Sequence, residues 1–566
     1  MKAVRIGVYR DRGTEKETWC RGENVFTRYI EEILSHAGIT FDRLNEISQM
    51  EQQPPDVLFV TAAGEPAWEA VLRLADQGGE VMIFGGGPDL ARRLGAAAGP
   101  AFGPGYAEVS GLKTPLLRFL KGVPWHLPSD SSAAEEGCLR AGSPDGKHSG
   151  TLITRFSVGA GWVTRWAIDV PTTVVHLQQG KNPVTADGHP APDGTADLDE
   201  GILKADDGFA LDWEWDRSDT ETGERYFAHP YADLWRETLL RDLFNRVRVR
   251  GWTLPFIDRW PGGVSQVAMI SLDSDSNLDE SAETTLKLLD ECGVCATWCM
   301  MEPGYHPSVY SCAVGEGHEM ALHYNAFDRD GGSWGEKAFA EQLRWLKEAI
   351  GCERVVSNKN HYTRFEGWGE LFRWCEKYGM ESDQTRGPSK KGNIGFLFGT
   401  CHPYFPIARG DEENRFYDVL EIGFLTQDLN LDRLADTSVI VPFLQAVEQV
   451  RGVSHFLFHP IHLHREEAVR NALRTVVREA ENRGFRFWTG QAINGWERSR
   501  RKQRITGVDD QRRPVMTGVP PRDSVVMVPL LRDEEPHEEP VEMRFGVPCR
   551  KWLSHQVLVE RTLPFP

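Results

Sequence analysis

Two aspartates, two positions apart, follow an apolar run and form the first pattern with catalytic potential. The run VAMISL leads directly into Asp273 and Asp275, in the sequence SLDSDSN. Enzymes built from alternating strands and helices place reacting groups just beyond the carboxyl ends of strands. In a turn the two carboxylates can diverge, so that one binds a metal ion and the other acts on a substrate. The alternative is structural, because Asp275 or Asn277 could cap the helix predicted over residues 279–293.

Histidines are concentrated in the same part of the chain. Nine of the seventeen lie between His306 and His464, in less than a third of the length. Most of them fall in three motifs: GHEMALH (317–323), NKNHYTRF (358–365) and SHFLFHPIHLH (454–464). Histidine is the commonest metal ligand and titrates near neutral pH, so the pattern indicates a metal site or acid–base catalysis. For the third motif, a second metal site and a structural loop before the next helix are both open alternatives.

Alternating strand and helix patterns must position these side chains. Residues 265–500 alternate apolar runs with helical segments, and a similar alternation covers the first 110 residues. Such alternation predicts parallel sheets with helices on both faces. The intervening segment is richer in turn pairs and β-forming runs, contains an amphipathic helix over 231–247, and ends in the linker GWTLPFIDRWPGG. The predicted divisions are 1–110, 111–255, 256–500 and 501–566, the last a small β-rich module.

The order of the motifs resembles the polysaccharide deacetylase family, carbohydrate esterase family 4. The family's first motif usually reads TFDDGP and here reads SLDSDS (271–276). GVCATW (293–298) is similar to the family's next strand, GHEMALH to the start of its second motif, and FLFHP (456–460) to its fifth motif. The resemblance covers about two fifths of the chain. It implies an α/β fold, a distorted (β/α) barrel over 256–500, with the active site at the carboxyl ends of the strands.

The resemblance also implies roles for individual residues. Asp273 is the expected general base, and Asp275 and His323 are expected ligands of a divalent metal ion, with zinc as the expected ion. The family's second histidine would fall at position 327, where this chain has Phe327. Because catalytic zinc usually has three protein ligands, we expect His361, which follows the next strand, to supply the third.

Four more residues complete the expected site. His459, after the strand FLF, is the expected general acid. Arg364 could replace the arginine that orients the base in the family, or it could be an ordinary surface residue. The glycine- and aromatic-rich stretch around His402 and Tyr404 is expected to face the substrate, and we predict these two residues and Trp368 as substrate-binding.

The first 110 residues resemble a flavodoxin-like, glutamine-amidotransferase-type domain, a kind often fused to carbohydrate enzymes. Those amidotransferases carry a nucleophilic cysteine at a strand-to-helix elbow, where this chain has Gly85, Gly86 and Gly87. Glycine cannot supply a thiolate nucleophile. We therefore expect no amidotransferase chemistry, and the glycine turn is either a ligand cradle or simply a tight turn.

Composition narrows the possible function classes. The chain has 566 residues, of which 40% are hydrophobic and 26% are charged, which is typical of a soluble globular protein of about three to four domains. Acidic residues outnumber basic ones by 83 to 64, and the net charge of −19 argues against a nucleic-acid partner, which requires a basic face. No secretory signal or membrane-length apolar run is recognisable, so we expect a cytoplasmic protein without a membrane partner.

Two functions from different classes fit these observations. The first is a metal-dependent deacetylase that acts on carbon–nitrogen bonds other than peptide bonds, in an amino sugar, an oligosaccharide or a related small amide. The second is a catalytically inert carbohydrate-binding protein with a degenerate deacetylase barrel. The retained aspartates and histidines favour the enzyme, whereas Phe327 favours the inert protein.

Overall fold

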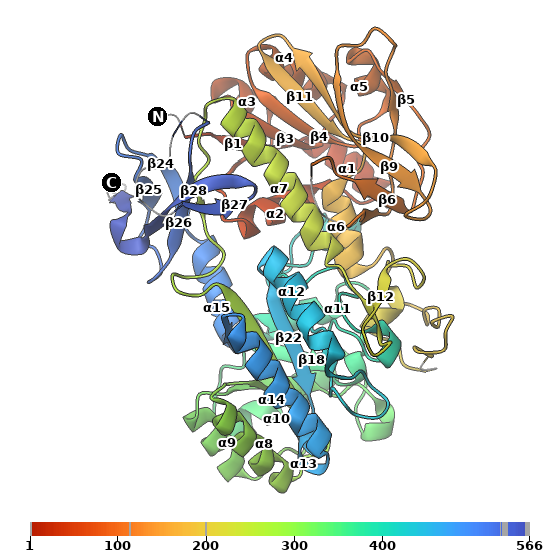
Figure 1. Cartoon of the computed structure of the whole chain (residues 1–566), viewed down its shortest axis with the longest axis vertical. Helices are drawn as coiled ribbons and strands as arrows, with labels where there is room; N and C mark the ends of the chain where they lie inside the picture. The colour runs from red at the N-terminus through yellow and green to blue at the C-terminus, as the bar shows by residue number, and fades with distance from the viewer. Residues whose placement is uncertain (1–2, 112–114, 199–200, 533, 535–540, 561–566) are drawn as a thin grey trace.

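The structure is a computed structural model that describes residues 3–111, 115–198, 201–532, 534 and 541–560. Two α/β parts are stacked along the long axis of the molecule, and a small β-rich part formed by the end of the chain lies beside the first of them (Figure 1). The predicted mixed α/β architecture with a β-rich C-terminal region is confirmed.

A nine-stranded sheet forms the core of the first part. Its parallel half consists, in order, of β2 (Asp42–Leu44), β1 (Ile6–Arg10), β3 (Val57–Ala62), β4 (Glu80–Phe84) and β11 (Gly161–Trp166). Its antiparallel half continues with β10 (His148–Val158), β9 (Ala134–Ala141), β6 (Gly105–Glu108) and β7 (Leu117–Phe119). The sheet predicted to be parallel is therefore mixed, and it includes strands well beyond residue 110. In the parallel half, β1 lies between β2 and β3, and β11 follows β4 at the junction with the antiparallel half.

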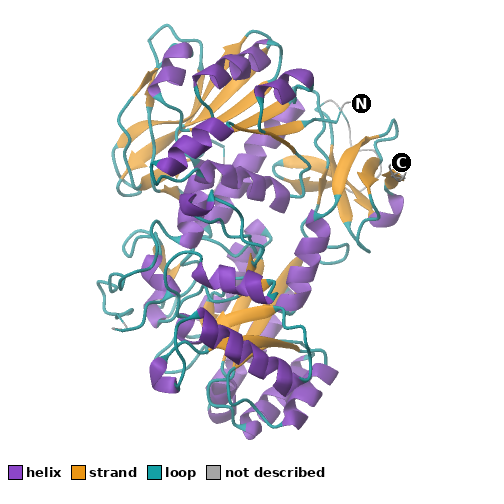
Figure 2. Ribbon diagram, turned by 180° about the vertical axis from the view of Figure 1, so that it is seen from behind, coloured by secondary structure: helices purple, strands orange, loops and turns teal. Residues whose placement is uncertain are grey.

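Helices flank this sheet, as Figure 2 shows from behind. They are α1 (Arg12–Cys20), α2 (Ile30–His36), α3 (Ile47–Gln52), α4 (Glu65–Asp76), α5 (Pro88–Arg93), α6 (Val170–Gln179) and α7 (Tyr231–Val249). Strands β1 and β4 are buried at every position. Strands that are buried on both faces have near-continuous apolar sequences, which explains why VRIGVY and EVMIF were recognisable as strands.

The second part is a curled parallel sheet, again of nine strands. Eight of them follow in the order β20 (Leu420–Glu421), β19 (Ser382–Asp383), β18 (Ser357–Asn360), β17 (Glu319–Tyr324), β16 (Thr297–Met300), β15 (Gln266–Asp273), β22 (Val453–Phe458) and β21 (Thr426–Gln427). The ninth, β23 (Phe485–Phe487), pairs with the first residues of β15. Within the described residues β20 and β21 do not pair, so the barrel is open at that point. The surrounding helices are α8 (Asp279–Cys292), α9 (Pro307–Gly315), α10 (Glu336–Ile350), α11 (Glu370–Tyr378), α12 (Ile440–Val450), α13 (Pro460–Arg465), α14 (Glu467–Asn482) and α15 (Gly490–Arg501).

Helix α7 contacts both α/β parts and the C-terminal module. The sequence predicted it as an amphipathic helix that ends the first half of the chain. It packs against α6 and also contacts β7, α12 and β28 (Val547–Leu553). On α7, Asp233 is fully buried and accepts hydrogen bonds from the Thr400 hydroxyl (2.6 Å) and the Cys401 amide (2.7 Å) of the barrel. Most faces of α7 are therefore buried against other elements.

The C-terminal module includes part of the predicted linker. Residues Phe256–Ile257 form β14, which pairs with β26 (Val525–Pro529) in a sheet completed by β28 and β27 (Val541–Arg544). A second small sheet contains β24 (Arg504–Val508), β25 (Pro514–Thr517) and β29 (Leu558–Glu560). Across the described residues, no helix combines the length and the apolar character needed to span a bilayer.

Candidate metal and catalytic site

A cavity of about 460 Å³ opens at the carboxyl ends of the barrel strands. Its walls include Asp273 at the end of β15, Asp275 just after it, His323 on β17, His361 after β18, Asp428 after β21 and His459 after β22. In a parallel sheet all carboxyl ends lie at one edge, so side chains from distant motifs meet there. The structure thus brings together five of the six residues predicted as metal ligands or catalytic groups, with Arg364 as the exception.

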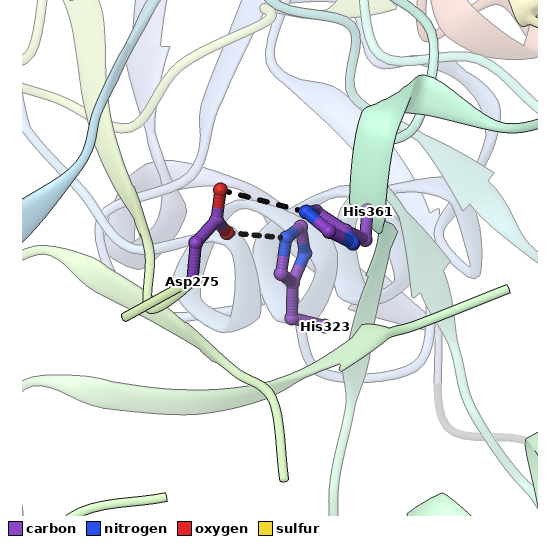
Figure 3. A group of neighbouring side chains, drawn as sticks. All are labelled: Asp275, His323 and His361. Carbon is purple, nitrogen blue, oxygen red and sulfur yellow. Dashed lines mark hydrogen bonds and ion pairs between the residues drawn. The ribbon is translucent and has the colours of Figure 1, made fainter. Parts of the chain in front are cut away.

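Asp275, His323 and His361 form a compact group in this cavity, and Figure 3 shows both imidazoles facing the carboxylate. Nε2 of His323 lies 3.2 Å from Oδ1 of Asp275, and Nε2 of His361 lies 3.5 Å from Oδ2. One donor atom from each residue falls within 4.8 Å of the other two. Both histidines are nearly fully buried, so their rings are held in place by the surrounding protein.

The hydrogen bonds of the two rings are compatible with a cation between them. Nδ1 of His323 donates to the Lys359 carbonyl (3.0 Å), and Nδ1 of His361 donates to Oδ1 of Asn325 (3.2 Å). In a neutral imidazole with its proton on Nδ1, Nε2 presents a lone pair. These lone pairs face carboxylate oxygens, an arrangement that requires a proton or a metal ion in the gap. Carbonyl or amide oxygens behind the rings are the usual outer partners of metal-ligating histidines, so the three residues fit a divalent ion.

The pKa of Asp275 agrees with this role. Burial would raise the pKa of this carboxyl group, but His459, His323 and His361 outweigh burial and hold the pKa well below its usual range. Asp275 is therefore a carboxylate at neutral pH and can act as an anionic ligand.

Phe327 does not leave the site one imidazole short. Its ring packs against Tyr362, with ring centroids 5.0 Å apart. The His361 imidazole reaches the site from the neighbouring strand instead, with its centroid 5.3 Å from that of His323. The imidazole of His361, the residue directly after β18, therefore lies close to that of His323.

Asp273 is held by a buried lysine that the sequence analysis missed. Nζ of Lys359 lies 3.4 Å from Oδ1 of Asp273 and donates to the Ser271 hydroxyl at 2.8 Å. The Ser271 hydroxyl in turn lies 2.8 Å from Nε2 of His455. Burial and the charge of Lys359 keep the pKa of His455 well below its usual range, so His455 is neutral and accepts from Ser271. The signal in the sequence was a lysine in the middle of a strand, SNKN, whose four residues are all buried.

The prediction that Arg364 orients the base is wrong. The Arg364 guanidinium pairs with Glu366 at 2.7 Å and bonds to the carbonyl of Ala326. It does not line the cavity. Arg364 follows the strand by four residues, by which point the chain has turned away from the barrel axis, whereas Lys359 lies within the strand and points inward.

His459 is held by Asp428, a second residue that the sequence analysis missed. Its backbone amide donates to Oδ1 of Asp428 at 2.8 Å, and its Nδ1 bonds to Oδ2 of the same carboxylate. Its Nε2 lies 3.5 Å from Oδ2 of Asp275. Burial lowers the pKa of His459, but Asp428 and Asp275 outweigh it and raise the pKa to about 10. His459 therefore carries a proton at neutral pH and can donate it from Nε2.

The alternative of a second metal site at the third histidine motif has some geometric basis. Asp428, His459 and His462 offer donor atoms within 4.8 Å of one another. Both oxygens of Asp428 are already bonded to His459, however, which favours an aspartate–histidine pair over a metal centre.

The three predicted substrate-binding residues do not line the cavity. His402 is buried between the two α/β parts, where its Nδ1 lies 3.2 Å from Oδ1 of Asp233. Tyr404 donates to the Gln178 carbonyl at 3.2 Å, and Trp368 donates to the Ile407 carbonyl at 2.8 Å. These predictions were wrong because the aromatic stretch with His402 and Tyr404 packs against α6 and α7, and because Trp368 is buried against Phe26.

A segment between α6 and α7 forms part of the cavity wall, which the sequence did not predict. We call residues 181–198 and 201–229 the crossing segment. Its Val184 exchanges two backbone hydrogen bonds with Gly367, both 2.8 Å, and its Phe227 bonds to Ile394 and Phe396. Asp206 accepts from Ser389 (2.7 Å) and from Asn393 (2.6 Å). Thr195, Asp197 and Lys204 consequently face the cavity, although the sequence assigned this stretch to the β-rich elaboration of the first part.

Part of the chain is similar to solved structures. No protein-family model and no curated protein sequence matches the chain. Among solved structures, the PuuE allantoinase matches with 14% identity and a TM-score of 0.32, over 42% of this chain and 91% of that one. A probable polysaccharide deacetylase from Pseudomonas aeruginosa matches with 15% identity and a TM-score of 0.31, over 42% and 92%. The Xyl-CE4 domain of a xylanase from the hindgut metagenome of Trinervitermes trinervoides matches with 13% identity and a TM-score of 0.26, over 40% and 89%.

Proposed function

We propose that this protein is a metal-dependent hydrolase that removes an N-acyl group, such as acetyl, from an amino sugar, an oligosaccharide or a related small amide. One observation carries the proposal. Asp275, His323 and His361 converge at one point of a cavity that also contains Asp273 and His459, the latter paired with Asp428.

The proposed ion is zinc, held by Asp275, His323 and His361. One carboxylate oxygen and two imidazole nitrogens are a ligand set typical of catalytic zinc sites. When bound, the ion would supply Lewis-acid activation of a water molecule and of the acyl oxygen. The ligand histidines hold their ring protons on Nδ1 through Lys359 and Asn325, so Nε2 stays available.

The remaining residues divide the proton transfers between them. Asp273 would accept the proton of the attacking water at a carboxylate oxygen, and Lys359 fixes the orientation of that carboxylate from behind. His459 would donate the proton on Nε2 to the leaving nitrogen, while Asp428 fixes its ring through Nδ1. Each such acid or base contributes ~10²- to 10⁴-fold to a rate.

The alternative hypothesis, a catalytically inert carbohydrate-binding protein, was based on Phe327 alone. With His361 beside His323, a third ligand is available without position 327. This observation supports the enzyme over the inert protein.

Metal analysis combined with a screen for acetate release tests the proposal. We expect about one divalent ion per chain and acetate release from at least one N-acetylated amino sugar. Asp275→Ala should lose both the ion and the activity, whereas Asp273→Asn should keep the ion and lose only the activity. Stoichiometric metal in Asp275→Ala would refute the assignment of the site.

A further inference from the structure

A layer of three buried polar side chains lies inside the barrel, next to the proposed general base. It consists of Ser271, Lys359 and His455, and none of them is among the described residues that line the cavity. Ser271 lies two residues before Asp273 on β15, so the two side chains project from the same face of the strand. His455 likewise lies two residues before Leu457, a cavity residue on the neighbouring strand β22. The layer therefore adjoins the proposed catalytic groups without contacting a substrate.

Hydrogen-bonding capacity determines the direction of each bond in this layer. Because an ammonium group can only donate, the Ser271 hydroxyl accepts from Nζ of Lys359 at 2.8 Å. The hydrogen of that hydroxyl is then available to Nε2 of His455, which lies 2.8 Å away. In the neutral His455 ring, Nδ1 donates to the carbonyls of Ile422 and Gly423, both at 3.2 Å, and this tautomer leaves Nε2 as an acceptor. A chain of hydrogen bonds therefore runs from these two carbonyls, through His455 and Ser271, to the ammonium of Lys359.

Lys359 is held beside Asp273 without a direct hydrogen bond to it. Its Nζ lies 3.4 Å from Oδ1 of Asp273, whereas a charge-assisted hydrogen bond between an ammonium and a carboxylate is about 2.7–2.9 Å long. Among the residues that the structure describes, none donates a hydrogen bond to this Oδ1. On another side, Nζ lies 4.5 Å from the ring centroid of the buried Phe424. The ammonium therefore lies near the carboxylate, while the lone pairs of Oδ1 stay available.

We propose that Ser271 and His455 are positioning residues for the general base, because they hold the ammonium of Lys359 away from a direct hydrogen bond to Asp273. Without the Ser271 hydroxyl, the ammonium can approach Oδ1 of Asp273 and donate to it. An oxygen that already accepts from an ammonium has less capacity to accept the proton of an attacking water, and proton transfer requires an acceptor within hydrogen-bond reach. The proposal rests on the proposed deacylase function, because Asp273 is assigned as a base in that reaction.

Steady-state acetate release by the zinc-loaded protein, with N-acetylglucosamine and N,N′-diacetylchitobiose as probes, measures the effect. A hydrogen bond to a charged group corresponds to about 10- to 100-fold, so Ser271→Ala should lower kcat by about tenfold or more, with KM and zinc content unchanged. His455→Leu should lower kcat less, because Ser271 can still accept from Lys359. Glutamine can place its amide oxygen near the position of Nε2, so His455→Gln should keep most of the rate that His455→Leu loses. Equal losses in the two His455 variants would overturn the proposal.

A double-mutant cycle tests whether Ser271 acts through Lys359. Lys359→Met removes the ammonium but keeps an unbranched side chain of similar length. In this background Ser271→Ala should have no further effect on kcat, because no ammonium remains to be held. The same loss in both backgrounds would indicate a purely structural role and would overturn the proposal. The matched controls are Ser454→Ala and His318→Leu, which alter buried barrel residues outside the layer and should leave kcat unchanged; equal losses in these controls would contradict a specific role of the layer.

Nitrogen-15 NMR of the histidine rings tests the hydrogen-bond chain without a substrate and distinguishes the failure of the two proposals. The resonances of His455, assigned with His455→Gln, should show a protonated Nδ1 and an unprotonated Nε2, and Ser271→Ala should shift the Nε2 resonance. A protonated Nε2 would overturn the proposal. If the resonances are as expected but neither probe releases acetate, the hydrogen-bond chain stands and the deacylase function fails. If acetate is released and Ser271→Ala keeps the full kcat, the positioning role is wrong and the deacylase function stands.

Discussion

Replacement of His361 by alanine is the sharpest test of the proposed metal site. Its Nε2 and that of His323 flank the two oxygens of Asp275, at 3.5 and 3.2 Å. Four-ligand zinc sites in small domains bind the ion with ~10–16 kcal/mol, or about 3 kcal/mol for each ligand. Loss of one ligand should therefore weaken zinc binding by about 100-fold or more. We expect His361→Ala to lose metal as completely as His323→Ala.

The assay is metal content after dialysis, followed by competition with a chromophoric chelator to obtain the dissociation constant. His459→Ala is the matched control, because it removes an imidazole from the same cavity but should keep the metal and lose rate. Asn325→Ala should weaken binding by about 10- to 100-fold, because Asn325 holds Nδ1 of His361. Full occupancy in His361→Ala with loss in His459→Ala would mean that the two roles are exchanged. Full occupancy in all three histidine variants would place the metal elsewhere and remove the basis of the deacylase function.

Four further predictions concern catalysis, stability and the first part of the chain. Asp273→Asn should keep the metal and lower kcat by ~10²- to 10⁴-fold in a steady-state acetate assay. Asp233→Ala should destabilise the protein by about 3 kcal/mol in urea unfolding, because it leaves buried partners in the barrel without an acceptor. The pKa of His176 is lowered to about 4 by burial, with Lys181 and Arg409 nearby, so the unfolded chain binds the extra proton between pH 6.5 and 4. The free energy of unfolding should therefore fall as the pH falls from 6.5 to 4, by up to about 1.4 kcal/mol per pH unit. His176→Gln should reduce this slope. Identical slopes in the two proteins would contradict the lowered pKa of His176. The full chain should release no ammonia from glutamine, because glycines 85–87 occupy the elbow after β4.

Local sequence patterns predicted many of the strands and helices and five residues of the site. Asp273 ends a strand that an apolar run identified, Asp275, His361 and His459 follow their strands closely, and all four line the cavity. The physical reason is that a parallel barrel brings the carboxyl ends of all strands to one edge. A residue's position relative to its own strand therefore predicts its position in the site, even when the motifs are far apart in the chain.

Contacts between distant segments were decided only by the tertiary structure. Lys359 contacts Asp273 and Asp428 contacts His459 because neighbouring strands place them there, and no local pattern distinguishes Lys359 and Asp428 from other buried or loop residues. The aromatic stretch around His402 was recognisable, but its burial depends on the packing of α7 against the barrel. The crossing segment likewise ends more than forty residues before Asp273, and its Lys204 reaches the cavity through pairing with the barrel. Secondary structure follows from the local periodicity of apolar residues. The residues that line a cavity depend instead on which distant segments pack against one another, and this packing is a property of the whole fold.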